Sequence, residues 1–152
     1  MSQHHPVVGP VRRLHRHWPF WAFVIVIAVL VLFARAAAAG ARATVLGEGR
    51  QDFEESCVAC HGGDATGTGT LATKLVKPPK DLTQIAVRNG GTFPFWQVFE
   101  IIAGEKPVAG HDTHQMPQFM ADMTVQERKP GFAPAHVRVL ELTHYLESLQ
   151  RK

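Results

Sequence analysis

The only two cysteines of this chain, Cys57 and Cys60, stand in the stretch SCVACHGG with His61 directly after them. A disulfide at this spacing would close a very short loop and constrain the unfolded chain little. A thioredoxin-like redox pair follows a strand, whereas the preceding GEGRQDFEES favours a helix. Zinc needs a second ligand pair, and the nearest candidates, His111 and His114, lie far downstream. The remaining chemistry is covalent haem attachment, in which both thiols form thioethers and His61 is the proximal iron ligand.

A haem iron bound by one histidine has a second axial position. A soft thioether is the usual occupant in haem proteins that transfer electrons. The segment HDTHQMPQFM supplies Met116, and Pro117 after it biases that methionine toward an extended backbone, which suits a ligand-bearing loop. Met116 is therefore the predicted distal ligand. Four alternative distal ligands remain: Met120, Met123, His111 and His114. If they do not bind iron, the two methionines would be ordinary core or surface residues.

The residues around the CxxCH motif favour a helix followed by a glycine-rich loop. The helix predicted over 48–60 has four residues on one face, at steps of four, four and three: Gly49, Phe53, Cys57 and Cys60. The next stretch, HGGDATGTGTLATKLVKPPKDLT, is dense in glycine, threonine and proline. Because glycine lets a backbone approach a ligand closely, this loop is predicted to pass beside the haem.

Two further helices are predicted downstream. One covers 93–103, with Pro94 in its first turn and a core side made of Trp96, Phe99 and Ile102. The indole N–H of Trp96 is also a candidate donor to a haem propionate. The other helix covers 134–149, and its apolar face comprises Val139, Leu142, Leu146 and Leu149. No segment alternates like a strand, so the predicted fold class is all-α, with three to four short helices around one haem.

An apolar run, PFWAFVIVIAVLVLF at 19–33, precedes the predicted haem domain. It is shorter than the roughly 20 residues that span a bilayer, unless it continues past Arg35. The arginines before it keep the N-terminus cytoplasmic and direct the rest outward. Cleavage after Ala39 or Ala43 and retention as an anchor both remain open. We therefore divide the chain into a targeting segment or membrane anchor at 1–43 and a haem domain at 44–152. The expected location is the periplasm, in solution or on the inner membrane.

The net charge of +3 is unevenly distributed. Residues 1–43 hold five arginines and no acid, whereas the remainder holds 11 basic and 13 acidic side chains. The basic excess thus belongs to the N-terminal segment. No basic stripe interleaved with aromatic residues appears in the domain, and nucleic acid is not expected as a partner.

Residues 45–150 resemble a monohaem class I cytochrome c, a bacterial exported c-type cytochrome domain, in the order and spacing of several features. A glycine and an aromatic residue, Gly49 and Phe53, precede the first cysteine at intervals of four, and a Met-Pro pair follows the haem motif. The ending LTHYLESL, with Leu142 and Tyr145, resembles the family's last helix. The resemblance implies that the first and last helices cross at Gly49.

The resemblance also implies a second contact on the proximal side of the haem. In the family, a proline carbonyl after the loop accepts a hydrogen bond from the proximal histidine, and Pro78 or Pro79 matches that place. Such a contact would fix the ring of His61 and raise its basicity. Pro79 and Trp96 are therefore the predicted additional haem contacts.

Two axial protein ligands leave no iron position open for oxygen, peroxide or substrate. The function expected is that of a single-electron carrier with one covalent haem c, and not of an enzyme. Its partners would be a dehydrogenase donor and an oxidase or reductase acceptor, together with the membrane if the N-terminal segment is retained. An alternative is a haem-bearing subunit of a larger membrane-associated dehydrogenase or oxidase. A ligand-binding or peroxidatic haem domain is a further alternative, which would need Met116 off the iron.

Overall fold

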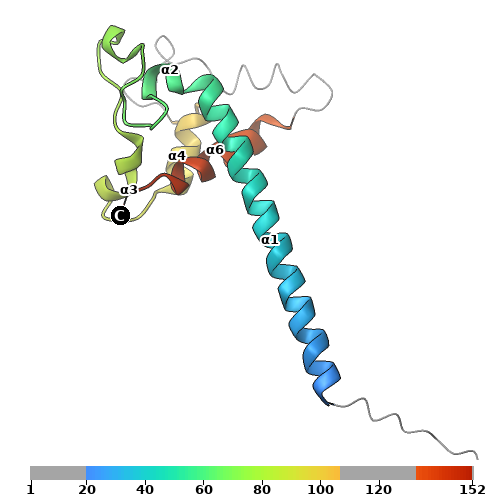
Figure 1. The fold of residues 1–152 in the computed structure, drawn as a ribbon. Coiled ribbons are helices and arrows are strands. Elements are labelled where there is room, and N and C mark those ends of the chain that lie inside the picture. The colour runs from blue at the N-terminus through green and yellow to red at the C-terminus, as the bar shows by residue number, and fades with distance from the viewer. Residues whose placement is uncertain (1–19, 107–132, 152) are drawn as a thin grey trace, which may run out of the picture. The chain divides into compact units, whose positions relative to one another are not determined.

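The computed structural model describes residues 20–106 and 133–151. The regular elements in these ranges are helices and 3₁₀ turns, and none is a strand. The elements follow one another in the order shown in Figure 1: α1 (Phe20–Ser56), α2 (Val58–His61), the 3₁₀ turns η1 (Ala72–Lys74) and η2 (Leu82–Gln84), α3 (Ile85–Arg88), α4 (Phe95–Ile102) and α6 (Ala135–Ser148). The all-α fold class is confirmed. The helix expected to begin at 48 is instead the last part of α1.

The chain divides into two compact units, Met1–Ala38 and Ala39–Lys152. In the first unit, the large apolar side chains of α1 from Phe20 to Phe33 are exposed. The helix is long and apolar enough to cross a membrane, a property that signal sequences near an N-terminus share. The division of the chain after residue 43 stays a prediction.

In the second unit, the last part of α1 crosses α6 at Gly49, as the resemblance implied. A Cβ atom at Gly49 would overlap the carbonyl group of Glu141 and lie 2.9 Å from the backbone nitrogen of Leu142. Beside this crossing, the ring of Phe53 lies 5.6 Å from that of Tyr145. The glycine is therefore required because the two helix backbones touch there.

Replacing Gly49 with alanine is expected to lower the free energy of unfolding of the haem-loaded protein by about 1–3 kcal/mol, the usual range for overpacking. The control is Gly47→Ala in the same helix, because nothing lies within 4 Å of a Cβ atom there. That change should raise stability by about 0.5–1 kcal/mol through helix propensity alone. Urea unfolding of both variants measures the difference, and equal effects would contradict the close crossing.

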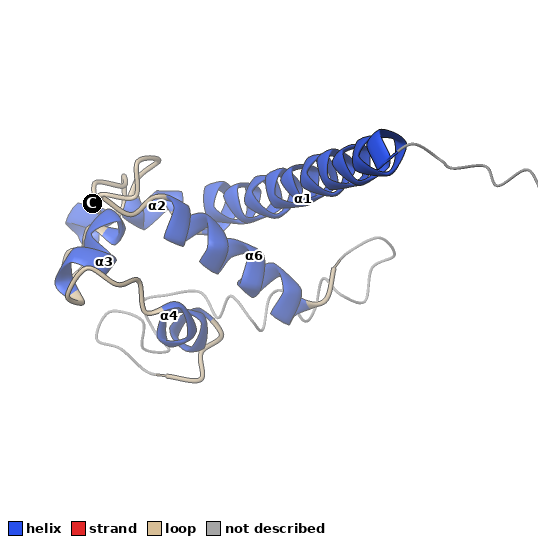
Figure 2. Cartoon of the chain, turned by 90° about the horizontal axis from the view of Figure 1, so that it is seen from below, coloured by secondary structure: helices blue, strands red, loops and turns tan. Residues whose placement is uncertain are grey.

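The core lies between α6, α4 and the last part of α1, and Figure 2 shows α4 beside α6. The predicted face of α6 is confirmed, since Val139, Leu142 and Leu146 are buried. The predicted core side of the 93–103 helix is wrong for Trp96, which is 66% exposed. Val98 is buried in its place. Val98 and Ile102 are four residues apart and lie on one side of α4. This side is buried because it faces α6.

The two shorter helices also begin and end within one or two residues of the predicted bounds. α4 starts at Phe95, with Pro94 as its N-cap residue, and α6 starts at Ala135, with Pro134 as its N-cap residue. A proline has no N–H to leave unsatisfied, so both prolines are compatible with the helix starts. The difference at Pro94, which was predicted inside the first turn, is one position.

Candidate functional site

The CxxCH motif lies where α1 ends and α2 begins. The single helix predicted over 48–60 is divided here, because Cys57 has φ −114° and departs from helical values. Backbone hydrogen bonds nevertheless continue across the junction, from Cys57 N–H to Phe53 O at 2.9 Å and from His61 N–H to Cys57 O at 2.8 Å. Cys57 and Cys60 are free, partly buried thiols on adjoining turns.

His61 is the last residue of α2, and it is 9% exposed. The chain leaves the helix through Gly62 in a left-handed conformation, with φ +80°. The carbonyl oxygen of His61 accepts a hydrogen bond of 2.7 Å from the N–H of Gly67. The backbone of the histidine is thus held by the helix before it and by the loop after it.

The thiol of Cys57 is not set up for thiolate chemistry. Burial raises the pKa of Cys57 to about 12, and the charges of Asp52 and Cys60 act in the same direction. A neutral thiol is a poor metal ligand and a poor redox nucleophile. In the described ranges, moreover, no three His, Cys, Asp or Glu side chains form a group that could hold a metal ion. The raised pKa of Cys57 weighs against the dithiol alternative, whereas the candidate zinc ligands His111 and His114 lie outside the described residues.

The glycine-rich loop folds back on α2. Gly69 N–H donates to Cys60 O at 3.1 Å, and Leu71 N–H donates to Ala59 O at 2.8 Å. A Cβ atom at Gly69 would lie 2.6 Å from the carbonyl carbons of Ala59 and Cys60, a distance that excludes any side chain. Here glycine makes room for protein backbone, and the contact of this loop with haem stays a prediction.

Pro79 is brought against the same loop. Gly67, with φ +87°, packs on the carbonyl group of Pro79, and a Cβ atom at Gly67 would lie 3.2 Å from the Pro79 carbonyl carbon. Pro79 is half-buried, whereas Pro78 is exposed. Pro79 is therefore the proline nearer to the loop that holds His61, and its hydrogen bond with the His61 ring stays a prediction.

The remaining predicted site residues are Met116, with its four alternatives, and Trp96. Met116 lies outside the described residues, as do its alternatives Met120, Met123, His111 and His114. The ring of Trp96 lies 5.4 Å from that of Phe95 and 5.7 Å from that of Phe99. The role of Trp96 as a haem contact stays a prediction.

A buried ion pair that was not predicted from the sequence joins α1 to α6. Arg138 Nε donates to Asp52 Oδ2 at 3.2 Å, and Arg138 Nη2 contacts Asp52 Oδ1. The two residues are 9% and 4% exposed, respectively. Each directly precedes a fully buried core residue, Phe53 or Val139, but this position alone does not mark a buried charge, since Glu141 precedes the buried Leu142 and is itself only partly buried.

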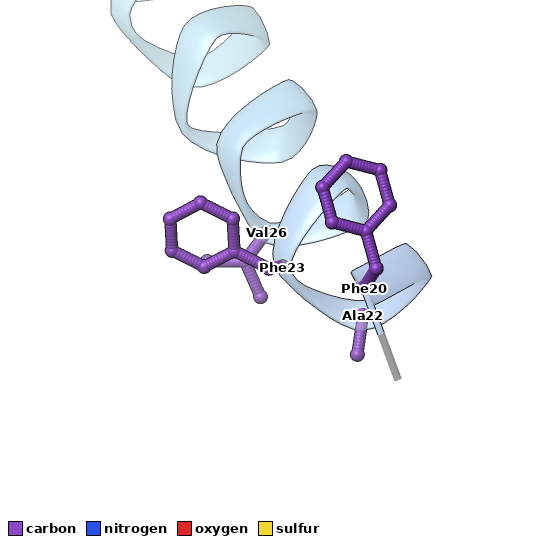
Figure 3. A pocket seen from close by; sticks show the side chains of 4 residues that line it. All are labelled: Phe20, Ala22, Phe23 and Val26. Atoms are coloured by element: carbon purple, nitrogen blue, oxygen red, sulfur yellow. The ribbon is translucent and has the colours of Figure 1, made fainter. Parts of the chain in front are cut away.

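A surface recess also lies at the start of α1, and Figure 3 shows its lining of Phe20, Ala22, Phe23 and Val26. All four residues belong to the first two turns of one helix, and none carries a polar side chain. The recess therefore offers no group for catalysis or for ligating a metal.

The described residues fit a covalently attached haem. Two free thiols lie on adjoining turns, and a buried imidazole follows the second one directly. Thioether formation consumes both thiols without requiring a thiolate in the finished fold. In the loop after α2, Gly67 donates to the carbonyl of His61 and packs on the half-buried Pro79.

Comparison with known proteins gives the same result. The family model described as Cytochrome c matches residues 46–130, which is more than half of the chain. No curated protein and no solved structure shows a significant match. The matched range contains the CxxCH motif and the Met-Pro pair. The chain therefore belongs to the cytochrome c family, as a c-type cytochrome domain that holds a covalently bound haem c.

Proposed function

We propose that this protein carries single electrons on a haem iron held between His61 and Met116. Membership of the cytochrome c family supports haem-based electron transfer in general. The assignment of His61 rests on its buried imidazole directly after two free thiols, which is the observation that carries the proposal, and that of Met116 rests on the Met-Pro pair in the sequence. Haem c supplies the one-electron change at iron when it is bound.

In this proposal, each of the chain's own residues has a limited task. Cys57 and Cys60 tether the haem through thioether bonds, which keep it in place in both redox states. His61 and Met116 would both ligate the iron and so exclude exchangeable ligands. Thioether ligation also raises the reduction potential relative to two histidines, because a soft ligand favours the reduced iron. The protein thus changes charge with little rearrangement.

The expected site of action is the periplasm, or the periplasmic face of the inner membrane if α1 is retained. The exposed apolar side chains of α1 support a membrane-related role for the N-terminal segment, as a signal or as an anchor. The partners are a dehydrogenase as donor and an oxidase or reductase as acceptor. The same exposed helix favours a second candidate, a haem subunit of a larger membrane-associated oxidoreductase. Stable co-purification with other subunits from solubilised membranes would support that candidate.

The ligation is tested by optical spectra of the oxidised and reduced protein, with Met116→Ala beside the parent. We expect the weak near-infrared sulfur-to-iron band in the oxidised parent and its complete loss in Met116→Ala. Met120→Ala is the matched control, and its band should remain. Loss of the band in the control alone would move the distal ligand to Met120. Its absence from the parent, together with ready binding of carbon monoxide by the reduced protein, would overturn the carrier assignment.

A further inference from the structure

The side chain of Gln150 connects the end of α6 with the segment around α3. Its Nε2 donates to Leu82 O at 2.9 Å and to Leu146 O at 2.7 Å, and its Oε1 accepts from Ala86 N–H at 2.9 Å. The residues joined to Gln150 at the α3 side are 64 and 68 positions away in the sequence. The half-buried amide of Gln150 therefore forms hydrogen bonds with three backbone groups: a carbonyl near the end of α6, a carbonyl in η2 and an N–H at the start of α3.

A backbone contact beside Gln150 supports the same connection. Arg151 N–H donates to Thr83 O at 3.0 Å. Thr83 is buried, and its N–H and hydroxyl both donate to Asp81 Oδ1, at 2.8 and 2.6 Å. The segment 81–86 is thus held internally by Asp81 and externally by Gln150 and Arg151, which follow α6.

One hydrogen bond connects this segment to the loop that follows His61. Leu82 N–H donates to the carbonyl of Ala65 at 2.8 Å. Ala65 is fully buried and has φ +61°, an uncommon conformation for a residue with a Cβ atom. In the same loop, Gly67 packs on Pro79 and donates to the carbonyl of His61 at 2.7 Å. Described contacts therefore run from Gln150 through Leu82 and Ala65 to the loop that holds the histidine.

We propose that Gln150 is a positioning residue for the proximal side of the haem, acting by fixing the segment 79–86 against the loop 62–69 that holds His61. The proposal rests on the proposed function, in which His61 binds iron. An orienting contact on the far side of a ligating histidine fixes its ring and raises its basicity, which favours the oxidised iron. Release of the segment by loss of Gln150 weakens that support and raises the reduction potential.

The test compares Gln150→Ala with the parent as haem-loaded full-length chains. Two quantities are measured: the reduction potential, and the hydrogen exchange of the Gly67 and Ala86 amides. We expect a positive shift of the potential and about tenfold faster exchange at both amides, because each amide depends on the hydrogen bonds that Gln150 organises. The Gly67 amide is the informative one, since Gln150 does not touch it.

Ser148→Ala is the matched control. The Ser148 hydroxyl donates to Tyr145 O at 2.6 Å at the same end of α6, and this contact does not reach the segment 81–86. The control should leave both the potential and Gly67 exchange as in the parent. A second variant, Gln150→Glu, keeps an acceptor for Ala86 N–H but loses the donor to Leu82 O. Because the added negative charge itself lowers the potential, the readout for this variant is Gly67 exchange, which should rise less than in Gln150→Ala.

Two results would overturn the positioning role. One is faster exchange at Ala86 with the potential and Gly67 exchange unchanged, which would make Gln150 a local stabiliser only. The other is a potential shift in Ser148→Ala equal to that in Gln150→Ala. Failure of the proposed function is recognised separately, by the absence of the sulfur-to-iron band from the parent. In that case Gly67 exchange still decides whether Gln150 supports the loop.

Discussion

Replacing both Cys57 and Cys60 with alanine is expected to abolish covalent haem and, with it, the cooperative unfolding transition of the domain. The reason is the small core. The buried hydrophobic residues of the described ranges are five alanines together with Phe53, Val98, Ile102, Val139, Leu142 and Leu146. A short chain with so few large buried side chains gains little from burial, and covering a haem supplies the missing apolar surface.

The measurement is urea unfolding followed by far-ultraviolet circular dichroism, with covalent haem detected on a denaturing gel. Ala59→Ser serves as the control, because this exposed residue lies between the two cysteines and its replacement leaves both thiols and His61 in place. The control should retain covalent haem and unfold cooperatively. A double-alanine chain that unfolded with a native-like sharp transition, without haem, would show that the core is sufficient by itself.

Replacing Asp52 with alanine is expected to destabilise the haem-loaded protein by about 3–5 kcal/mol. Loss of this carboxylate removes the contacts that Asp52 makes with the buried guanidinium of Arg138, and breaking a buried ion pair has a penalty of this size. Arg138→Met should have an effect of the same order, because it leaves the carboxylate buried. The double variant Asp52→Leu, Arg138→Met should recover most of the loss, because apolar residues of similar volume can replace a buried pair.

The chain contains a matched surface pair for comparison. Arg50 Nε lies 2.7 Å from Glu54 Oε1 in the same helix, with side chains 66% and 54% exposed. Arg50→Ala should therefore have a far smaller effect than Asp52→Ala, as is usual for exposed pairs one helical turn apart. Equilibrium unfolding of the four variants gives the comparison. An Asp52→Ala loss no larger than that of Arg50→Ala would show that the buried pair is unimportant for stability.

The sequence predicts the fold well at positions where the type of residue permits only one structural role. The steps from Gly49 to Phe53 and Cys57 locate the helix crossing, because a glycine on an apolar face favours a close backbone approach. The pattern of Val139, Leu142 and Leu146 likewise predicts the buried face of α6, since a 3.6-residue period specifies a side of the helix. These features depend on local periodicity, which a sequence contains.

The features that were not predicted depend on which other segment of the chain packs against them, or on backbone angles. Trp96 was placed on the core side of its helix, although only the position of α6 decides which apolar stripe of α4 is buried. The break at Cys57 depends on backbone angles that the helical spacing of the motif does not reveal. The contacts of Gln150 are with residues more than 60 positions earlier, and no local pattern marks a glutamine as their partner.

The buried pair between Asp52 and Arg138 also determines how the two ends of the domain recognise each other. The partners are 86 residues apart in sequence, so they meet only when the chain closes. A slip of α6 by one turn would move Arg138 about 5 Å along the axis of α6, away from Asp52, and would place other residues of α6 against Gly49. Since breaking a buried ion pair costs several kcal/mol, such misaligned pairings are strongly disfavoured. The ion pair and the glycine together therefore select one alignment of the terminal helices during folding.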